Sequence, residues 1–179
     1  MKVWVIAASV AVGIAVHGAA CAQNAAALGS SPSSSVVLVD SMGKVAARPL
    51  NDTIMLITLG SGVEAPALIR PIYDADGRTV SGLATWQAGG GVLFTSPDCT
   101  TGGYVYSLPH AGVRATTQVQ TPAGIVLYVG AIGTGTTVAV HSILYDSGCS
   151  PVTVQQNGLL PVLLTVNLST GYPPPLSFQ

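Results

Sequence analysis

The sequence predicts an all-β fold, an antiparallel β-sandwich or barrel-like domain of roughly ten to twelve short strands that follows an N-terminal signal helix. Short runs of β-branched and aliphatic residues are separated by Gly, Pro, Asn and Asp, which is typical of strands joined by tight turns. Helix signals are nearly absent after the first segment. Only 7% of the 179 residues are charged, and Glu64 is the only glutamate, so the chain lacks the residues for the polar face of a surface helix.

Residues 1–22 have the pattern of a signal peptide. Lys2 precedes an apolar run, Val3–Val16, whose ~21 Å as a helix is too short for a bilayer core of ~30 Å. The small residues of Ala20-Cys21-Ala22 predict cleavage between Ala22 and Gln23. One alternative is a lipoprotein signal in which Cys21 is acylated, although Gly18 stands where that signal usually has a large aliphatic residue. An uncleaved anchor is the other alternative, and no later run is apolar for long enough to form a transmembrane helix.

The chain after the signal divides into three parts. Residues 23–35 are rich in Ala, Ser and Gly and predict a flexible leader. Residues 36–170 are expected to form the β domain, and residues 171–179, with three consecutive prolines, a polyproline-type tail. The expected strands are Ser35–Val39, Lys44–Ala47, Thr53–Leu59, Ala67–Tyr73, Thr79–Trp86, Gly91–Thr95, Gly103–Ser107, Val113–Val119, Gly124–Gly130, Thr136–Tyr145, Pro151–Gln155 and Leu159–Leu168.

Turn motifs support the strand pattern. Asp40–Lys44 and Asp74–Arg78 share the outline D-x-x-G-[KR], in which Gly permits a positive φ and Asp can bond to the backbone. Asn157-Gly158 predicts a two-residue hairpin between the last two expected strands. Pro161 cannot donate to a ladder, so it places the start of the final strand at an edge or a bulge.

Two cysteines, Cys99 and Cys149, remain after the signal. An even pair in an exported chain indicates one disulfide, and the closed loop of about 50 residues corresponds to ~4 kcal/mol of stabilisation. The alternative is a pair of buried free thiols. The chain has no C-x-x-C motif and no paired histidine spacing, so we expect no metal site built on these residues.

Residues for catalysis are sparse. A serine hydrolase would need His110 or His141 to meet a carboxylate and a hydroxyl, and the sequence has no G-x-S-x-G motif. His110 lies in a predicted loop and His141 in the middle of a predicted strand. Asp74 and Asp76 echo part of a calcium loop, but Arg78 occupies the next alternate position and no glutamate follows. We therefore predict no catalytic residue, no cofactor and no bound metal.

Two segments carry a resemblance to a known group of proteins. These are Val39–Val45 and Phe94–Val105, which reads F-T-S-P-D-C-T-T-G-G-Y-V. Together they resemble exported bacterial β-rich proteins without an assigned function, which share a D-x-x-G-[KR] turn and an F-T-x-x-x-C segment. In this chain Gly102-Gly103 directly precedes Tyr104, which departs from that pattern. The resemblance implies a secreted or surface β domain with a Cys99–Cys149 bridge, and it implies no catalytic residue.

Charge supplies the main functional expectation. A net charge of −1 gives no basic field for nucleic acid. A surface with few charges and few lysines to guard strand edges favours association with another surface. We therefore expect an exported non-catalytic β domain, secreted, periplasmic or at the cell surface, with a structural, adhesive or envelope-associated role. The alternatives are a small secreted hydrolase and a small outer-membrane β-barrel.

Overall fold

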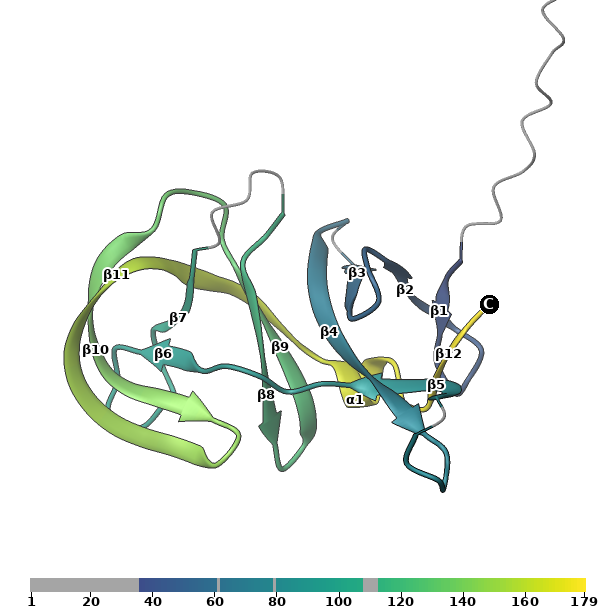
Figure 1. The fold of residues 1–179 in the computed structure, drawn as a ribbon. Coiled ribbons are helices and arrows are strands. Elements are labelled where there is room, and N and C mark those ends of the chain that lie inside the picture. The colour runs from purple at the N-terminus through teal and green to yellow at the C-terminus, as the bar shows by residue number, and fades with distance from the viewer. Residues whose placement is uncertain (1–35, 61, 79, 108–112) are drawn as a thin grey trace, which may run out of the picture. The chain divides into compact units, whose positions relative to one another are not determined.

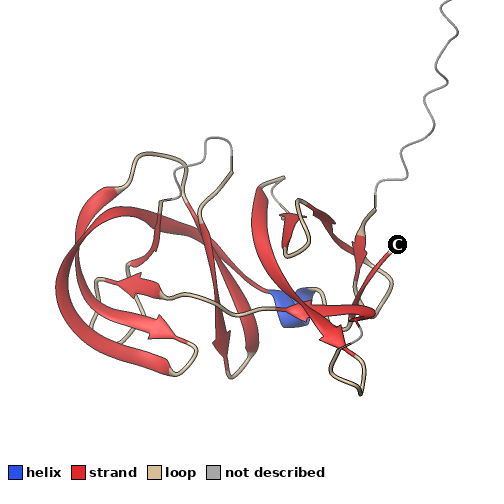
Figure 2. Cartoon of the chain, in the orientation of Figure 1, coloured by secondary structure: helices blue, strands red, loops and turns tan. Residues whose placement is uncertain are grey.

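The computed structural model describes residues 36–60, 62–78, 80–107 and 113–179 (Figure 1). The predicted signal peptide, its cleavage site, Cys21 and the leader lie outside these residues, as does His110. The described chain is almost entirely strand, which confirms the all-β class (Figure 2). Its one helix, α1 (Leu168–Gly171), is too short to cross a membrane. The strands are β1 (Leu38–Val39), β2 (Val45–Pro49), β3 (Ile54–Thr58), β4 (Glu64–Tyr73), β5 (Val80–Trp86), β6 (Val92–Phe94), β7 (Gly103–Tyr106), β8 (Thr116–Thr121), β9 (Gly124–Gly130), β10 (Thr136–Tyr145), β11 (Gly148–Asn167) and β12 (Leu176–Phe178).

Six strands form a closed barrel in the order β1-β12-β5-β4-β3-β2, and β2 pairs with β1 to close it. Apolar side chains that alternate along these strands point inward and are buried, as the period of two requires. The barrel core also receives side chains from β9 and from α1, so the two sheets share one hydrophobic cluster. Its buried members are Leu38, Ala46, Ala47, Met55, Ile57, Leu59, Ala65, Ala67, Ile69, Ala84, Trp86, Ile125, Leu127, Val129, Leu168 and Leu176.

The expected polyproline-type tail, residues 171–179, is wrong. After the prolines the chain forms β12, which lies between β1 and β5 and completes the barrel. Leu176 is fully buried, and Gln179 and Val37 exchange two backbone hydrogen bonds, of 2.9 and 3.0 Å. The prolines end the helical turn at α1 but do not stop the following residues from pairing, because Leu176-Ser177-Phe178 again alternates apolar and polar residues.

The remaining strands form a six-stranded sheet in the order β10-β6-β7-β11-β9-β8, with a further pairing of β10 with β11. The pairings β10–β6, β6–β7, β7–β11 and β11–β10 therefore make a ring of four strands. Strand β11 runs for 20 residues and serves both parts of the sheet, since it pairs first with β10, then with β7 and finally with β9. Figure 1 shows β10 and β11 curving side by side.

The predicted hairpin at Asn157-Gly158 is also wrong. These residues lie inside β11, and the turn between β10 and β11 is formed by Asp146 and Ser147 instead. Asn157-Gly158 forms a bulge, because Thr136 pairs with Leu159 whereas the residue two positions later in β10 pairs with Gln156. Gly158 has φ +72°, so the feature that favours Gly in a hairpin turn also favours it in a bulge.

Both D-x-x-G-[KR] motifs form hairpin turns of the barrel, between β1 and β2 and between β4 and β5. In each turn the glycine has positive φ and donates its N–H to the carbonyl of the first aspartate. The side-chain bonds differ, however. Asp40 accepts from the N–H groups of Met42 and Lys44, whereas in the second turn Asp76 accepts from Arg78.

One buried side chain ties the two sheets together. Gln118 on β8 is 2% exposed, and its amide accepts a hydrogen bond from the backbone N–H of Leu68 on β4 and donates one of 3.1 Å to the Leu68 carbonyl. On the same strand, Thr116 Oγ1 donates to the carbonyl of Pro66 at 2.8 Å. The amide of Gln118 thus bonds to both backbone groups of Leu68, whose carbonyl also accepts from the Gln87 N–H at 3.0 Å.

The closing strand gives a test of the fold. Leu176→Ala should lower the free energy of unfolding by about 2–5 kcal/mol, because it empties a fully buried site in the barrel core. Urea denaturation followed by tryptophan fluorescence measures this change. Leu50→Ala is the matched control, since Leu50 is exposed, and it should cost about 0.5 kcal/mol or less. Equal effects of the two substitutions would contradict the place of β12 in the barrel.

Candidate functional site

A disulfide joins Cys99 to Cys149 with their Cα atoms 5.9 Å apart, so the free-thiol alternative does not describe this structure. Cys99 lies in the loop between β6 and β7, and Cys149 is the second residue of β11. The bond therefore links the β6–β7 hairpin to the β10–β11 hairpin, which are the two halves of the four-stranded ring. It fixes the beginning of β11 to the loop between β6 and β7.

Ser142 holds the Cys99 loop independently of the disulfide. Its side chain is fully buried on β10, and its hydroxyl donates to the Ser96 carbonyl at 2.6 Å and accepts from the Cys99 N–H at 3.0 Å. Cys99 adopts φ +58°, a left-handed conformation that is uncommon for a residue other than Gly. The buried hydroxyl thus stabilises the turn from which the Cys99 sulfur bonds to Cys149.

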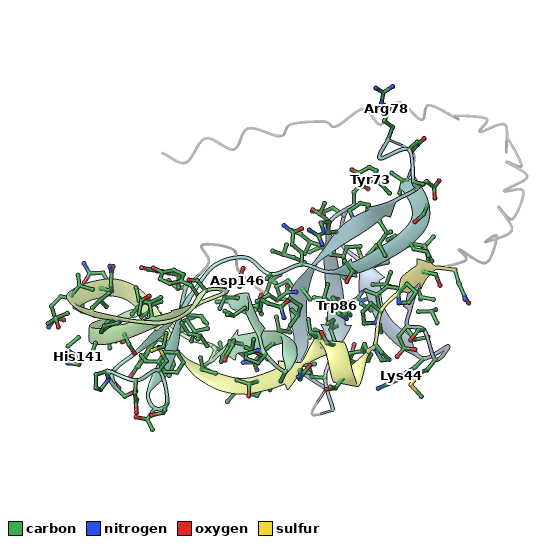
Figure 3. All side chains as sticks on the ribbon, turned by 90° about the horizontal axis from the view of Figure 1, so that it is seen from below. Lys44, Tyr73, Arg78, Trp86, His141 and Asp146 are labelled. Atoms are coloured by element: carbon green, nitrogen blue, oxygen red, sulfur yellow. A yellow bond between two sulfur atoms is a disulfide. The ribbon has the colours of Figure 1, made fainter. Side chains whose placement is uncertain are left out.

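His141 is half-buried on β10. Among the described residues it makes neither a hydrogen bond nor an ion pair, and Figure 3 shows it well apart from Asp146. The serine, histidine and carboxylate that the hydrolase alternative needs are therefore not brought together around His141.

The candidate calcium ligands serve a turn instead. Asp74 and Asp76 lie at the β4–β5 hairpin, where the Asp74 carbonyl accepts from Gly77 and Asp76 Oδ1 accepts from the Arg78 N–H at 2.8 Å. In the part of the chain that the structure describes, no three His, Cys, Asp or Glu side chains come close enough to hold a metal ion. Calcium needs six or more oxygen ligands, which this turn does not gather.

A pocket of about 310 Å³ lies where the β8–β9 turn meets the β10–β11 turn. Asp146 Oδ1 accepts a 2.8 Å hydrogen bond from the Gln120 N–H, which joins the two turns at the pocket. The pocket contains a single carboxylate and so lacks the pair of carboxylates that glycoside hydrolysis uses. Its lining residues are Gln120, Thr121, Pro122, Leu144, Tyr145, Asp146, Ser147 and Gly148.

Strand β11 has an open edge, by which we mean the side of residues 150–157 that faces away from β10. The Leu159 carbonyl accepts from the Thr136 hydroxyl on β10, and the Pro161 carbonyl accepts from the N–H of Ala131, which follows β9. Strands β9 and β10 therefore lie on the same side of β11. The Gly158 carbonyl accepts from Ser107, which puts β7 on the other side. Because β7 pairs only with residues 159–161, no described strand covers residues 150–157 on that side.

The open edge of β11 carries no charge. Its sequence is S-P-V-T-V-Q-Q-N, and most of its side chains are exposed, including Thr153, Val154 and Gln155. Native sheets usually protect such an edge with charged side chains, especially Lys, or with Pro. Here Pro151 is the only Pro or charged residue on the edge, and two bulges, at Val152-Thr153 and at Asn157-Gly158, interrupt its register with β10. The other end of this sheet is better covered, since Gly89 bridges to Gln118 on β8.

Sequence reasoning located the disulfide but not the edge. The Asn157-Gly158 motif suggested a hairpin, which would have paired residues 151–155 with the following strand. An unbroken run of strand-forming residues on both sides of the motif was the signal that could have indicated one long strand. The role of Ser142 had no local signal, because its two partners are more than 40 residues away.

Comparison of the chain with protein-family models, with curated proteins and with solved structures gives no match.

Removal of the disulfide should destabilise the domain without changing its fold. Its 50-residue separation corresponds to about 4 kcal/mol in the chain-entropy account, so the double variant Cys99→Ser/Cys149→Ser should lose roughly that much free energy of unfolding. Urea denaturation measures the loss, with the reduced native protein as the matched control. A loss below about 1 kcal/mol in both would contradict the constraint.

The pKa of Asp98 reports on the hydrogen bonds in the Cys99 loop. Hydrogen bonds from the Thr100 and Ser96 side chains to the charged carboxylate lower the pKa of Asp98 below its usual value. This contribution to stability is present above the ordinary pKa of an aspartate and is lost as the pH falls through the lower folded value. Carboxyl NMR titration should show that Thr100→Val raises the Asp98 pKa toward the ordinary value. An unchanged pKa would contradict the role of Thr100.

Proposed function

We propose that the chain is an exported, non-catalytic β domain with a structural role in the cell envelope or at the cell surface, and that it acts by associating with further copies of itself or by attaching to the envelope. The disulfide supports export, since such bonds persist in oxidising compartments. The described residues offer no acid–base pair around His141 or in the pocket at Asp146, so the proposal assigns no reaction to the chain.

The distribution of charge carries the proposal. After residue 22 the chain has 12 charged side chains, and 11 of them lie between Asp40 and Arg114. From residue 115 to residue 179 the only charged side chain is Asp146. This segment contains β8 to β12 and includes the open edge of β11. A surface that stays free in solution normally has many charges of both signs, so this part of the molecule is suited to being covered.

Exposed apolar side chains on the same segment support this view. Ile132 is 82% exposed in the loop that connects β9 to β10, and Leu163 is 53% exposed on β11. Single exposed apolar residues are common, but here they occur in a stretch of the sequence with a single charged residue. Apolar surface in a neutral setting favours contact with a protein surface over contact with water. Further exposed apolar residues of the segment are Tyr145, Val154 and Phe178.

Sedimentation velocity of the exported protein tests the proposal. The weight-average mass should rise with concentration between about 1 μM and 1 mM, and it should change little with salt, because the surface offers few charges to screen. A parallel sedimentation assay with an envelope fraction measures attachment. A protein that stays monomeric over this range and leaves the envelope fraction unbound would overturn the proposal.

A further inference from the structure

We propose that the open edge of β11, residues 150–157, pairs antiparallel with the same edge of a second copy of the chain. The inference rests on the proposed function and names the surface through which the copies associate. The edge is eight residues long and spans about 26 Å. Pairing would satisfy the backbone N–H and C=O groups that no described strand reaches on this side.

Self-pairing follows from the chemistry of the edge. In two antiparallel copies related by a two-fold axis, a residue at the axis faces its own copy, and every other residue i faces a residue j whose copy faces i. A charged side chain near the axis would therefore meet its own copy, which is destabilising, whereas a neutral side chain has no such cost. Between Ser150 and Asn157 the edge has no charged side chain, so no pair of like charges arises. Val and Thr, which recur here, form favourable cross-strand pairs.

The edge is held in place by its own sheet before any pairing, with a bulge at Val152-Thr153, because Val140 pairs with Val154 whereas Ser142 pairs with Pro151. Residues 148–156 are held on one side by β10, and the disulfide at Cys149 anchors their beginning. Val152 packs beneath the strand against the cluster of Leu93, Val140 and Leu159. Because the strand is extended and supported before binding, the second copy would order few further residues, which favours association.

The shape of the ring also favours this edge over others in the molecule. The barrel is closed and offers no unpaired strand. Strand β8 is partly covered on its outer side by the bridge from Gly89 to Gln118. The open edge of β11 has eight residues and is longer than β8, which has six, and Val154 on it is 39% exposed.

The first experiment introduces a charge on the edge. Val154→Lys should weaken self-association about tenfold or more in sedimentation equilibrium, because two lysines would approach each other across the pair. Val45→Lys is the matched control, since Val45 is 58% exposed on β2, a barrel strand with partners on both sides, and this variant should associate like the native protein. Circular dichroism checks that both variants remain folded.

The second experiment tests the pairing directly. Residues that face each other across an antiparallel pair have Cα atoms about 4.5–5.5 Å apart, which a disulfide can span. Single cysteines at Val152, Val154 and Gln156 should therefore give a covalent dimer at the position nearest the two-fold axis, under mild oxidation. Mass spectrometry identifies the new bond and shows that the Cys99–Cys149 bond is intact. Val45→Cys should remain monomeric on non-reducing gels.

The outcomes separate this inference from the proposed function. A native protein that self-associates, with no effect of Val154→Lys and no cross-link on β11, would overturn the edge pairing and leave the proposed function standing. A protein that binds the envelope fraction as a monomer would likewise overturn the edge pairing and leave the proposed function standing. A monomer without envelope binding would overturn both. Loss of association in Val154→Lys together with a β11 cross-link would support both.

Discussion

Backbone pairing between the two ends of the described chain holds the barrel closed. With β12 between β1 and β5, both Leu38 and Leu176 are buried, and the preceding turn brings Tyr172 against Trp86, whose indole N–H donates to the Tyr172 carbonyl at 2.9 Å. Lys44 covers the other side of this contact, with its Nζ 4.2 Å from the centre of the Tyr172 ring. The rest of the barrel depends on this closure, because an open barrel would expose two strand edges and its core together.

The closed barrel and the six-stranded sheet differ in whether they leave a strand edge unpaired. The barrel leaves no edge and carries most of the charged residues, among them the exposed ion pair between Arg48 and Glu64. In the sheet, four strands form a ring, and one of them, a long strand, also pairs with β9 outside the ring. That strand, β11, lies in the part of the chain that is almost without charge. The unpaired edge thus lies in the part of the chain that has the fewest charges to keep another strand away. We therefore connect this edge with association between copies of the chain.

Local patterns in the sequence were sufficient for the fold class, for most strands and for the cysteine pair. They failed where a distant partner decides the structure. The prolines before Leu176 resemble the end of a domain, and only pairing with Leu38, more than 130 residues earlier, makes the following residues a strand. Asn157-Gly158 fits a turn and a bulge equally well, and the pairing of Thr136 with Leu159 decides between them. Gln118 and Ser142 acquire their roles only in the assembled sheets.

The link between the two sheets has a consequence for the conditions that the protein can withstand. The amide of Gln118 has no titratable proton and no net charge, and its two bonds to Leu68 are shielded from water. Low pH neutralises carboxylates and high salt screens ion pairs, but neither changes the hydrogen bonds of such an amide. The contact between Gln118 and Leu68 is therefore suited to surroundings whose pH and ionic strength vary.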